Sequence, residues 1–347
     1  MSVKVLIIDN ATGGVAYDKR WDSVQIDLIG GNVSATGIIP GVKVKDFEYA
    51  NFQILSALSK NLGWYLKDEI DDNTIVIFPD ARNTLAINLH EYRMTTRKKF
   101  KIIGFWTDGI YHGDGTTRNR LRGTNYNWSQ KFERCLVECY DYNLVFLESS
   151  VAKFKHYHVK KSGNKVLQCA LPFTAAINTV REEAKEFGEV KEDLVIMNTS
   201  PHDAHDLKIF EALQKEFPSY TFINAYEKDL PHKSYVKLLS RAKVVLSTCN
   251  TDSNPYSVLE AMALGCIPVL PDIPIYNEMF DNKWLYNTII LKQPYLNYIR
   301  NREQIHGQVR DAVENYTDYD LTTEVQKIHD EYFDSEQLKD IITEITC

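Results

Sequence analysis

The sequence lacks any apolar run of the length that crosses a membrane, and its first apolar run, residues 3–8, has only the length of a strand. A membrane span needs about 20 apolar residues, and a secretory signal needs a longer apolar region than residues 3–8 provide. We therefore expect a soluble protein in the cytoplasm, with no membrane span.

The sequence has only six cysteines, and their spacing matches no metal-binding pattern. The only close pair, Cys135 and Cys139, has helical spacing, and no second pair or histidine cluster completes a zinc site. No Gly-x-Gly-x-x-Gly follows a predicted strand, which argues against a nicotinamide-dependent oxidoreductase. We expect reduced packing cysteines, no metal ligands and no obligatory cofactor, although a divalent metal is compatible with the sequence.

A net charge of -7 argues against a protein that coats nucleic acid, but the charge is unevenly distributed. Residues 93–134 contain ten Lys or Arg against three acids, whereas residues 311–347 are acidic. This asymmetry can steer a charged partner toward the basic region.

Short apolar runs alternate with longer amphipathic ones, which is typical of parallel sheets wrapped by helices. The predicted strands are 3–8, 74–78, 101–105, 143–147, 194–197, 220–224, 244–247 and 267–270. The predicted helices are 49–62, 130–140, 206–217, 234–240, 257–263, 302–315 and 322–345. A polar stretch at 155–164 predicts a break between two series of elements.

This order predicts an α/β protein with two Rossmann-like, doubly wound domains facing a central cleft. The expected domains are 1–165 for the acceptor and 166–310 for the donor, with acidic helices at 311–347 packing back toward the first domain. Ligands of such sheets bind beyond the carboxyl ends of the strands. Many unrelated enzymes share this architecture, so the function has to come from residues.

Residues 247–271 carry the most specific signal. A strand leads into a polar turn, a helix starts near Ser257, and Gly265 ends it. The N–H groups and the positive dipole end at a helix start favour a phosphate. Glu260, one turn into this helix, can accept hydrogen bonds from vicinal ribose hydroxyls. The plain structural alternative is a helix that only packs on the sheet.

This stretch resembles nucleotide-sugar-dependent glycosyltransferases of GT-B architecture, most closely the retaining family whose signature is an acid, seven residues, Glu and Ala-Met-Ala-x-Gly-x-Pro-Val. The resemblance covers about residues 194–278 and implies a UDP- or GDP-sugar donor, with UDP preferred. It places Glu260 on the donor ribose and Asp252, shorter than the family's Glu, at the sugar as a catalytic residue. The turn facing donor hydroxyls and diphosphate would consist of Asn254, Pro255, Tyr256 and Ser257.

The sequence departs from this family where Arg and Lys usually neutralise the diphosphate. The substitutes available are Ser200, His202, Lys208, Lys233, the helix dipole or a metal. We favour Ser200 and His202, although His202 and His205 could equally be cap or surface residues. Gly13 and Gly14 follow the first strand and would let the backbone approach the donor phosphates, unless they form a plain tight turn.

The segment that follows the strand at 101–105 contains two candidate catalytic residues, Asp108 and His112. Asp108 or His112 could act as a general base or bind acceptor and sugar hydroxyls. The segment Phe105-Trp106-Thr107-Asp108 resembles the aromatic-Thr-Asp of phage DNA glucosyltransferases that act on hydroxymethylcytosine. The alternative for Asp108 is a helix-capping carboxylate.

The basic region also contains an acceptor candidate, formed by Arg118, Arg120, Arg122 and Trp128. Arginines with interleaved aromatics suit phosphate contacts and base stacking, so duplex DNA or tRNA is the predicted partner. Residues 270–280 resemble tRNA queuosine mannosyltransferases, which favours the same class of partner. A solvated charged loop is the alternative.

These observations predict a glycosyltransferase that modifies hydroxymethylated pyrimidine in phage DNA, in the host cytoplasm. The alternatives are a cell-envelope polysaccharide glycosyltransferase and a catalytically inactive GT-B binding protein. The family signature favours retention of the anomeric configuration, whereas the Asp108 likeness favours inversion, and the sequence leaves this open.

Overall fold

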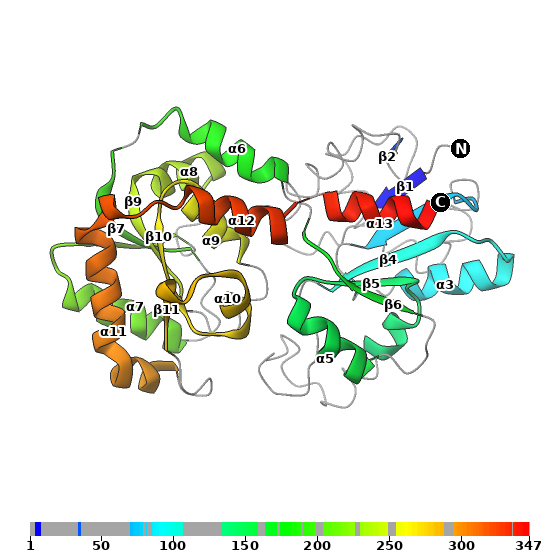
Figure 1. Ribbon diagram of the computed structural model, residues 1–347, viewed down its shortest axis with the longest axis horizontal. Helices are drawn as coiled ribbons and strands as arrows, with labels where there is room; N and C mark the ends of the chain where they lie inside the picture. Colours follow the sequence, from blue (N-terminus) through cyan, green and yellow to red (C-terminus); the bar gives the residue numbers. More distant parts are fainter. Residues whose placement is uncertain are drawn as a thin grey trace. The chain divides into compact units, whose positions relative to one another are not determined.

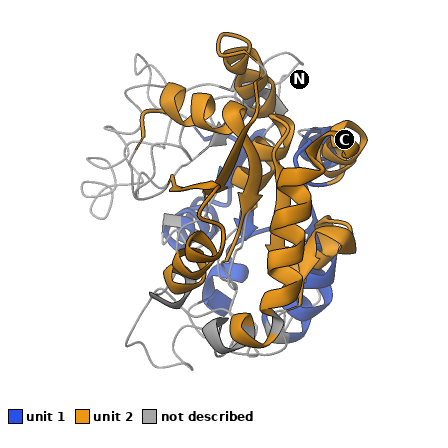
Figure 2. Cartoon of the chain, turned by 90° about the vertical axis from the view of Figure 1, so that its left-hand side faces the viewer, with its two compact units in different colours: residues 1–175, 332–347 blue, residues 176–331 orange. Residues whose placement is uncertain are grey.

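The computed structural model describes residues 4–7, 34–35, 70–78, 81, 85–106, 133–158, 164–171, 174–188, 190–198, 204–225, 230–248, 255–287, 294–334 and 336–346. The chain divides into two compact units (Figures 1 and 2). Unit 1 is Met1–Ala175 with Tyr332–Cys347, and unit 2 is Ala176–Glu331. None of the helices in these ranges combines the length and apolar content that crossing a bilayer requires.

Unit 1 contains a six-stranded parallel sheet in the order β2-β1-β3-β4-β5-β6. Its strands are β1 (Lys4–Ile7), β2 (Ser34–Ala35), β3 (Thr74–Phe78), β4 (Lys101–Trp106), β5 (Tyr142–Val145) and β6 (Lys165–Gln168). Every residue of β3 and β5 is buried. Because successive side chains in a strand point to opposite faces, both faces of this part of the sheet are covered.

Three helices of unit 1 are α3 (Leu85–Thr96), α5 (Glu148–His158) and α13 (Glu336–Thr346). Helix α13 runs antiparallel to β6, since Gln337 accepts a hydrogen bond from the Ala170 backbone at 2.9 Å and Glu344 pairs with Lys165 at 2.8 Å. The ring of Phe333 packs on Phe146, with centroids 5.4 Å apart. The last helix of the chain therefore completes the first unit.

The predicted polar break at 155–164 was wrong over its first four residues, because α5 continues to His158. The His158 side chain is fully buried, and its Nε2 lies 3.5 Å from Oε2 of Glu133. Phe154 and His158 are four residues apart and therefore share one helix face, which packs against Trp106. The strand β6, which follows, was not predicted.

Unit 2 contains a five-stranded parallel sheet in the order β11-β10-β9-β7-β8. Its strands are β7 (Glu192–Met197), β8 (Thr221–Asn224), β9 (Ala242–Leu246), β10 (Ile267–Pro271) and β11 (Leu285–Tyr286). The helices are α6 (Thr174–Ala184), α7 (Ala204–Glu216), α8 (His232–Arg241), α9 (Tyr256–Ala263), α10 (Pro274–Met279), α11 (Pro294–Glu314) and α12 (Thr322–Tyr332). Figure 1 shows these elements around their sheet.

The strand order of unit 2 creates a topological switch point between β7 and β9. The chain leaves β7 toward β8 on one side and leaves β9 toward β10 on the other. With right-handed crossovers, α7 lies on one face of the sheet and α8 and α9 on the opposite face. The carboxyl ends of β7 and β9 are therefore the place where open α/β sheets of this topology bind ligands.

The predicted strands and most of the predicted helices are confirmed to within a few residues. The helix predicted at 49–62 lies outside the described residues. The single helix predicted at 322–345 was wrong, since it is two helices, α12 and α13. The buried Phe333 separates them, and the Leu171 backbone donates to the carbonyl of Tyr332 at 2.8 Å. Those contacts hold the chain in a non-helical connection. Helix α11 begins at Pro294, earlier than the predicted 302.

Candidate functional site

Helix α9 begins at the carboxyl edge of the unit 2 sheet, directly after Pro255. The carbonyl of Pro255 accepts hydrogen bonds from the backbone of Val258 at 3.0 Å and Leu259 at 3.2 Å. Proline has no side-chain group that could cap the first N–H groups of the helix, and the N-cap makes no side-chain hydrogen bond here. The positive end of α9 therefore suits an anionic ligand.

Asn198 follows β7 directly and ties that strand to two helices. Its side chain is 9% exposed, and its Nδ2 donates to the carbonyl oxygen of Ser257 at 2.7 Å. The same nitrogen donates to the hydroxyl of Tyr235, on α8, at 3.2 Å. The end of β7, the first turn of α9 and α8 thus meet at one amide.

Glu260 lies one turn into α9 and is only 5% exposed. The hydroxyl of Tyr235 donates to its Oε2 at 3.4 Å. Burying a carboxylate is costly unless hydrogen bonds hold it, so this contact helps Glu260 to stay at the site. A carboxylate at this place can accept hydrogen bonds from hydroxyl groups, and the helix start beside it can bind a phosphate.

Two further buried polar residues, Ser247 and Thr248, follow the neighbouring strand β9 directly. Tyr276 donates to Ser247 Oγ at 3.0 Å, and Tyr286 donates to the Ser247 carbonyl at 2.9 Å. These hydrogen bonds fix the backbone from which the segment before α9 departs. Ser247 therefore shapes the site.

Of the predicted site residues, the structure brings Ser257 and Glu260 together through Asn198 and Tyr235. Tyr256 is fully buried in the core of unit 2, so it can face a ligand only through its backbone. The other predicted site residues except Pro255 lie outside the described residues: Gly13, Gly14, Asp108, His112, Arg118, Arg120, Arg122, Trp128, Ser200, His202, Asp252 and Asn254.

Several predicted cations have internal partners. Lys233, considered for the diphosphate, pairs with Glu186 at 2.6 Å in an exposed ion pair. In the basic region, Arg93 pairs with Asp141 at 2.5 Å, and Lys98 donates to the carbonyl of Ile70. Arg93 and Lys98 therefore serve the fold of unit 1.

Asn198 and Tyr235 were not among the residues predicted for the site. A signal existed for Asn198, since a polar residue directly after a strand in a doubly wound domain stands where ligands bind. Tyr235 lacks such a signal, because its contact with Glu260 joins two helices that are separate in the sequence.

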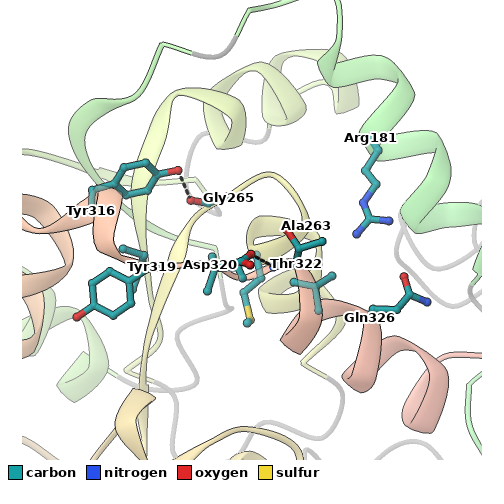
Figure 3. Close-up of a pocket in the computed structure, with 12 residues that line it drawn as sticks. Arg181, Ala263, Gly265, Tyr316, Tyr319, Asp320, Thr322 and Gln326 are labelled. Carbon is teal, nitrogen blue, oxygen red and sulfur yellow. Dashed lines mark hydrogen bonds between the residues drawn. The ribbon is translucent and has the colours of Figure 1, made fainter.

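A polar pocket of about 430 Å³ lies at the other end of α9 (Figure 3). Arg181 of α6, Thr322 and Gln326 of α12, and Ala263 of α9 line it. On its border the hydroxyl of Tyr316 donates to the carbonyl of Gly265 at 2.8 Å. The pocket is therefore separate from the network around Glu260.

Two units built on parallel sheets, with a helix start and a buried carboxylate at the switch point of the second, define an α/β protein of the GT-B fold, as the sequence predicted. No family model matches the sequence.

Three solved structures share this fold over nearly their whole length. The first is HepE from Anabaena in complex with UDP and glucose, with a TM-score of 0.56, 11% identity and 99% of both chains covered. The second is the UDP-forming α,α-trehalose-phosphate synthase from Burkholderia vietnamiensis, with a TM-score of 0.54, 12% identity, and 100% of this chain and 99% of that chain covered. The third is sucrose-phosphate synthase from Thermosynechococcus elongatus, with a TM-score of 0.53, 11% identity, and 99% of this chain and 98% of that chain covered. At these identities the likeness establishes the fold.

Proposed function

We propose that this protein is a glycosyltransferase that uses a nucleoside diphosphate sugar, preferably a UDP-sugar, bound at the switch point of unit 2. The observation that carries the proposal is the buried Glu260, held by Tyr235 one turn inside a helix whose start suits an anion. A similar structure contains UDP and glucose, and another is named for forming UDP, which supports this donor class.

In this proposal the ribose, the diphosphate and the sugar of the donor contact different residues. Glu260 accepts hydrogen bonds from the ribose hydroxyls, and the first turn from Pro255 to Ser257 binds the diphosphate. Asp252 and Asn254 contact the sugar. Further diphosphate contacts are proposed for Gly13, Gly14, Ser200 and His202.

The proposed transfer replaces one bond to the anomeric carbon by another. The bond to the diphosphate oxygen breaks, the acceptor oxygen forms the new bond, and the nucleoside diphosphate leaves. The acceptor hydroxyl loses its proton to a base, for which Asp108 and His112 are the proposed residues. Both stereochemical outcomes are compatible with this set of residues.

The acceptor that we propose is hydroxymethylated pyrimidine in DNA, and its support is the sequence of the basic region alone. Arg118, Arg120, Arg122 and Trp128 would contact the nucleic acid. A polysaccharide acceptor fits the same donor site equally well and is the second candidate.

Thermal unfolding with UDP, GDP, ADP and their common sugars tests the donor site. A ligand that binds only the folded state stabilises it by about 2.7 kcal/mol at 100 times its Kd. We expect one nucleoside diphosphate to raise Tm and Glu260→Gln to reduce the shift, whereas the exposed Glu303→Gln on α11 keeps it. A Tm that no nucleotide moves would refute the proposal.

The acceptor is tested by transfer of radiolabelled sugar to hydroxymethylated DNA and to bacterial polysaccharide. The triple replacement of Arg118, Arg120 and Arg122 by Ala should weaken binding to duplex DNA, and undiminished binding would exclude the DNA acceptor. Nucleotide binding without any transfer or donor hydrolysis would instead indicate a GT-B binding protein.

A further inference from the structure

The hydrogen bonds of Asn198 determine which way its side-chain amide faces. The carbonyl of Ser257 can only accept, so the amide atom 2.7 Å from it must be the nitrogen. The second proton of that nitrogen is directed to the hydroxyl oxygen of Tyr235, 3.2 Å away. Tyr235 thus accepts from Asn198 and has its own proton to donate.

That proton is directed to Glu260, whose Oε2 lies 3.4 Å from the Tyr235 hydroxyl. The three side chains therefore form a directional relay from amide to hydroxyl to carboxylate. Both ends of the relay are more than nine-tenths buried. Hydrogen bonds away from water hold side chains in single orientations, so the relay restricts rotation of the Glu260 carboxylate.

One atom of the relay has no hydrogen-bond partner in the ranges that the structure describes, the Oδ1 of Asn198. Leaving such an acceptor buried without a partner is unfavourable. A hydroxyl that arrives with a ligand would satisfy it. This acceptor belongs to the residue that anchors the start of α9, so it lies beside the proposed nucleotide site.

We infer that Asn198 and Tyr235 are positioning residues that orient the Glu260 carboxylate toward the vicinal hydroxyls of a ribose. They make the site select ribonucleotides over 2′,3′-dideoxyribonucleotides. This inference rests on the proposed function, because it assigns the donor nucleotide to the site around α9. A carboxylate free to rotate would lose one of its two hydroxyl contacts, whereas a held carboxylate keeps both.

Calorimetric titration with UDP, GDP and their 2′,3′-dideoxy analogues tests the relay. The wild type should bind the ribonucleotide at least about tenfold more tightly, and Tyr235→Phe should lose about 3- to 10-fold on the ribonucleotide but less than about twofold on the dideoxy analogue. Asn198→Ala should lose more affinity for the ribonucleotide than for the dideoxy analogue, with a part of the loss common to both because Asn198 also holds the first turn of α9. Tyr316→Phe, the same change at the opposite end of α9, should leave both affinities unchanged.

A double-mutant cycle shows whether Tyr235 acts through Glu260. In a Glu260→Gln background, Tyr235→Phe should cause no further loss of ribonucleotide affinity. Equal losses on both nucleotides, or additive effects in the cycle, would overturn the relay and leave the donor site standing. If the wild type binds none of the four nucleotides, the proposed function itself fails.

Discussion

The ammonium nitrogen of Lys191 lies 2.6 Å from the carbonyl oxygen of Leu264, the residue that ends α9. It also donates to the carbonyls of Ala242 at 2.7 Å and Leu239 at 3.4 Å, at the end of α8. Helix C-termini carry partial negative charge, so one half-buried cation stabilises both helices that contribute to the candidate site.

Replacement of Lys191 by Met should therefore destabilise unit 2 while preserving the volume of the side chain. Three carbonyls would lose a charged donor, and we expect a loss of about 2–4 kcal/mol in the free energy of unfolding. Urea denaturation measures it, with the exposed Lys208→Met as the matched control. A loss no larger than that of the control would show that Lys191 contributes no net stability.

Gly265→Ala should destabilise the turn after α9. Gly265 has φ 81°, and a Cβ there would lie 2.9 Å from the hydroxyl oxygen of Tyr316. The left-handed conformation alone costs a residue with a side chain about 1–2 kcal/mol.

Gly307 provides the opposite control, because it lies inside α11 and a Cβ added there meets nothing within 4 Å. Gly307→Ala should stabilise the protein by about 0.5–1 kcal/mol, since alanine favours helix. Thermal unfolding of both variants should give Tm changes of opposite sign. Equal signs would contradict the conformational explanation.

Tyr316 should make the stability of unit 2 decrease at alkaline pH. Burial raises the pKa of its hydroxyl from 10.0 to about 12. Between these values the unfolded chain has lost a proton that the folded protein keeps, so stability is fully present below pH 10 and decreases toward pH 12.

Urea midpoints measured from pH 9 to pH 12 test this contribution. The decrease should be smaller in Tyr316→Phe, which also lacks the hydrogen bond to the carbonyl of Gly265. Comparing the two proteins removes the contribution of other groups that titrate in the same range. Identical pH profiles would assign the decrease to those other groups.

Arg93→Met should lower the stability of unit 1. The guanidinium pairs with Asp141, and the same carboxylate oxygen accepts from the Ile102 backbone at 2.8 Å. Losing one partner of a partly buried charged hydrogen bond should cost about 1–3 kcal/mol. Lys101→Met, at an exposed neighbouring position, is the control in thermal unfolding. Equal stability of the two variants would show that Arg93 is not needed for the fold, and Arg93 would again be a candidate for nucleic-acid contact.

The sequence determined the parts of this protein that depend on neighbours along the chain. The strand at 74–78 was predicted to the residue, because a continuous apolar run is typical of a strand covered on both faces. The start of α9 and the position of Glu260 one turn inside it also follow from local spacing.

Only the tertiary structure decided which distant residues meet. Asn198 contacts Ser257 across 59 positions of the chain, and Tyr235 contacts Glu260 across 25. Hydrophobic periodicity indicates which face of a helix is buried, but it carries no information about the polar partner on another element. His158 shows the same limit, since its polar surroundings in the sequence gave no sign that packing on Trp106 would bury it.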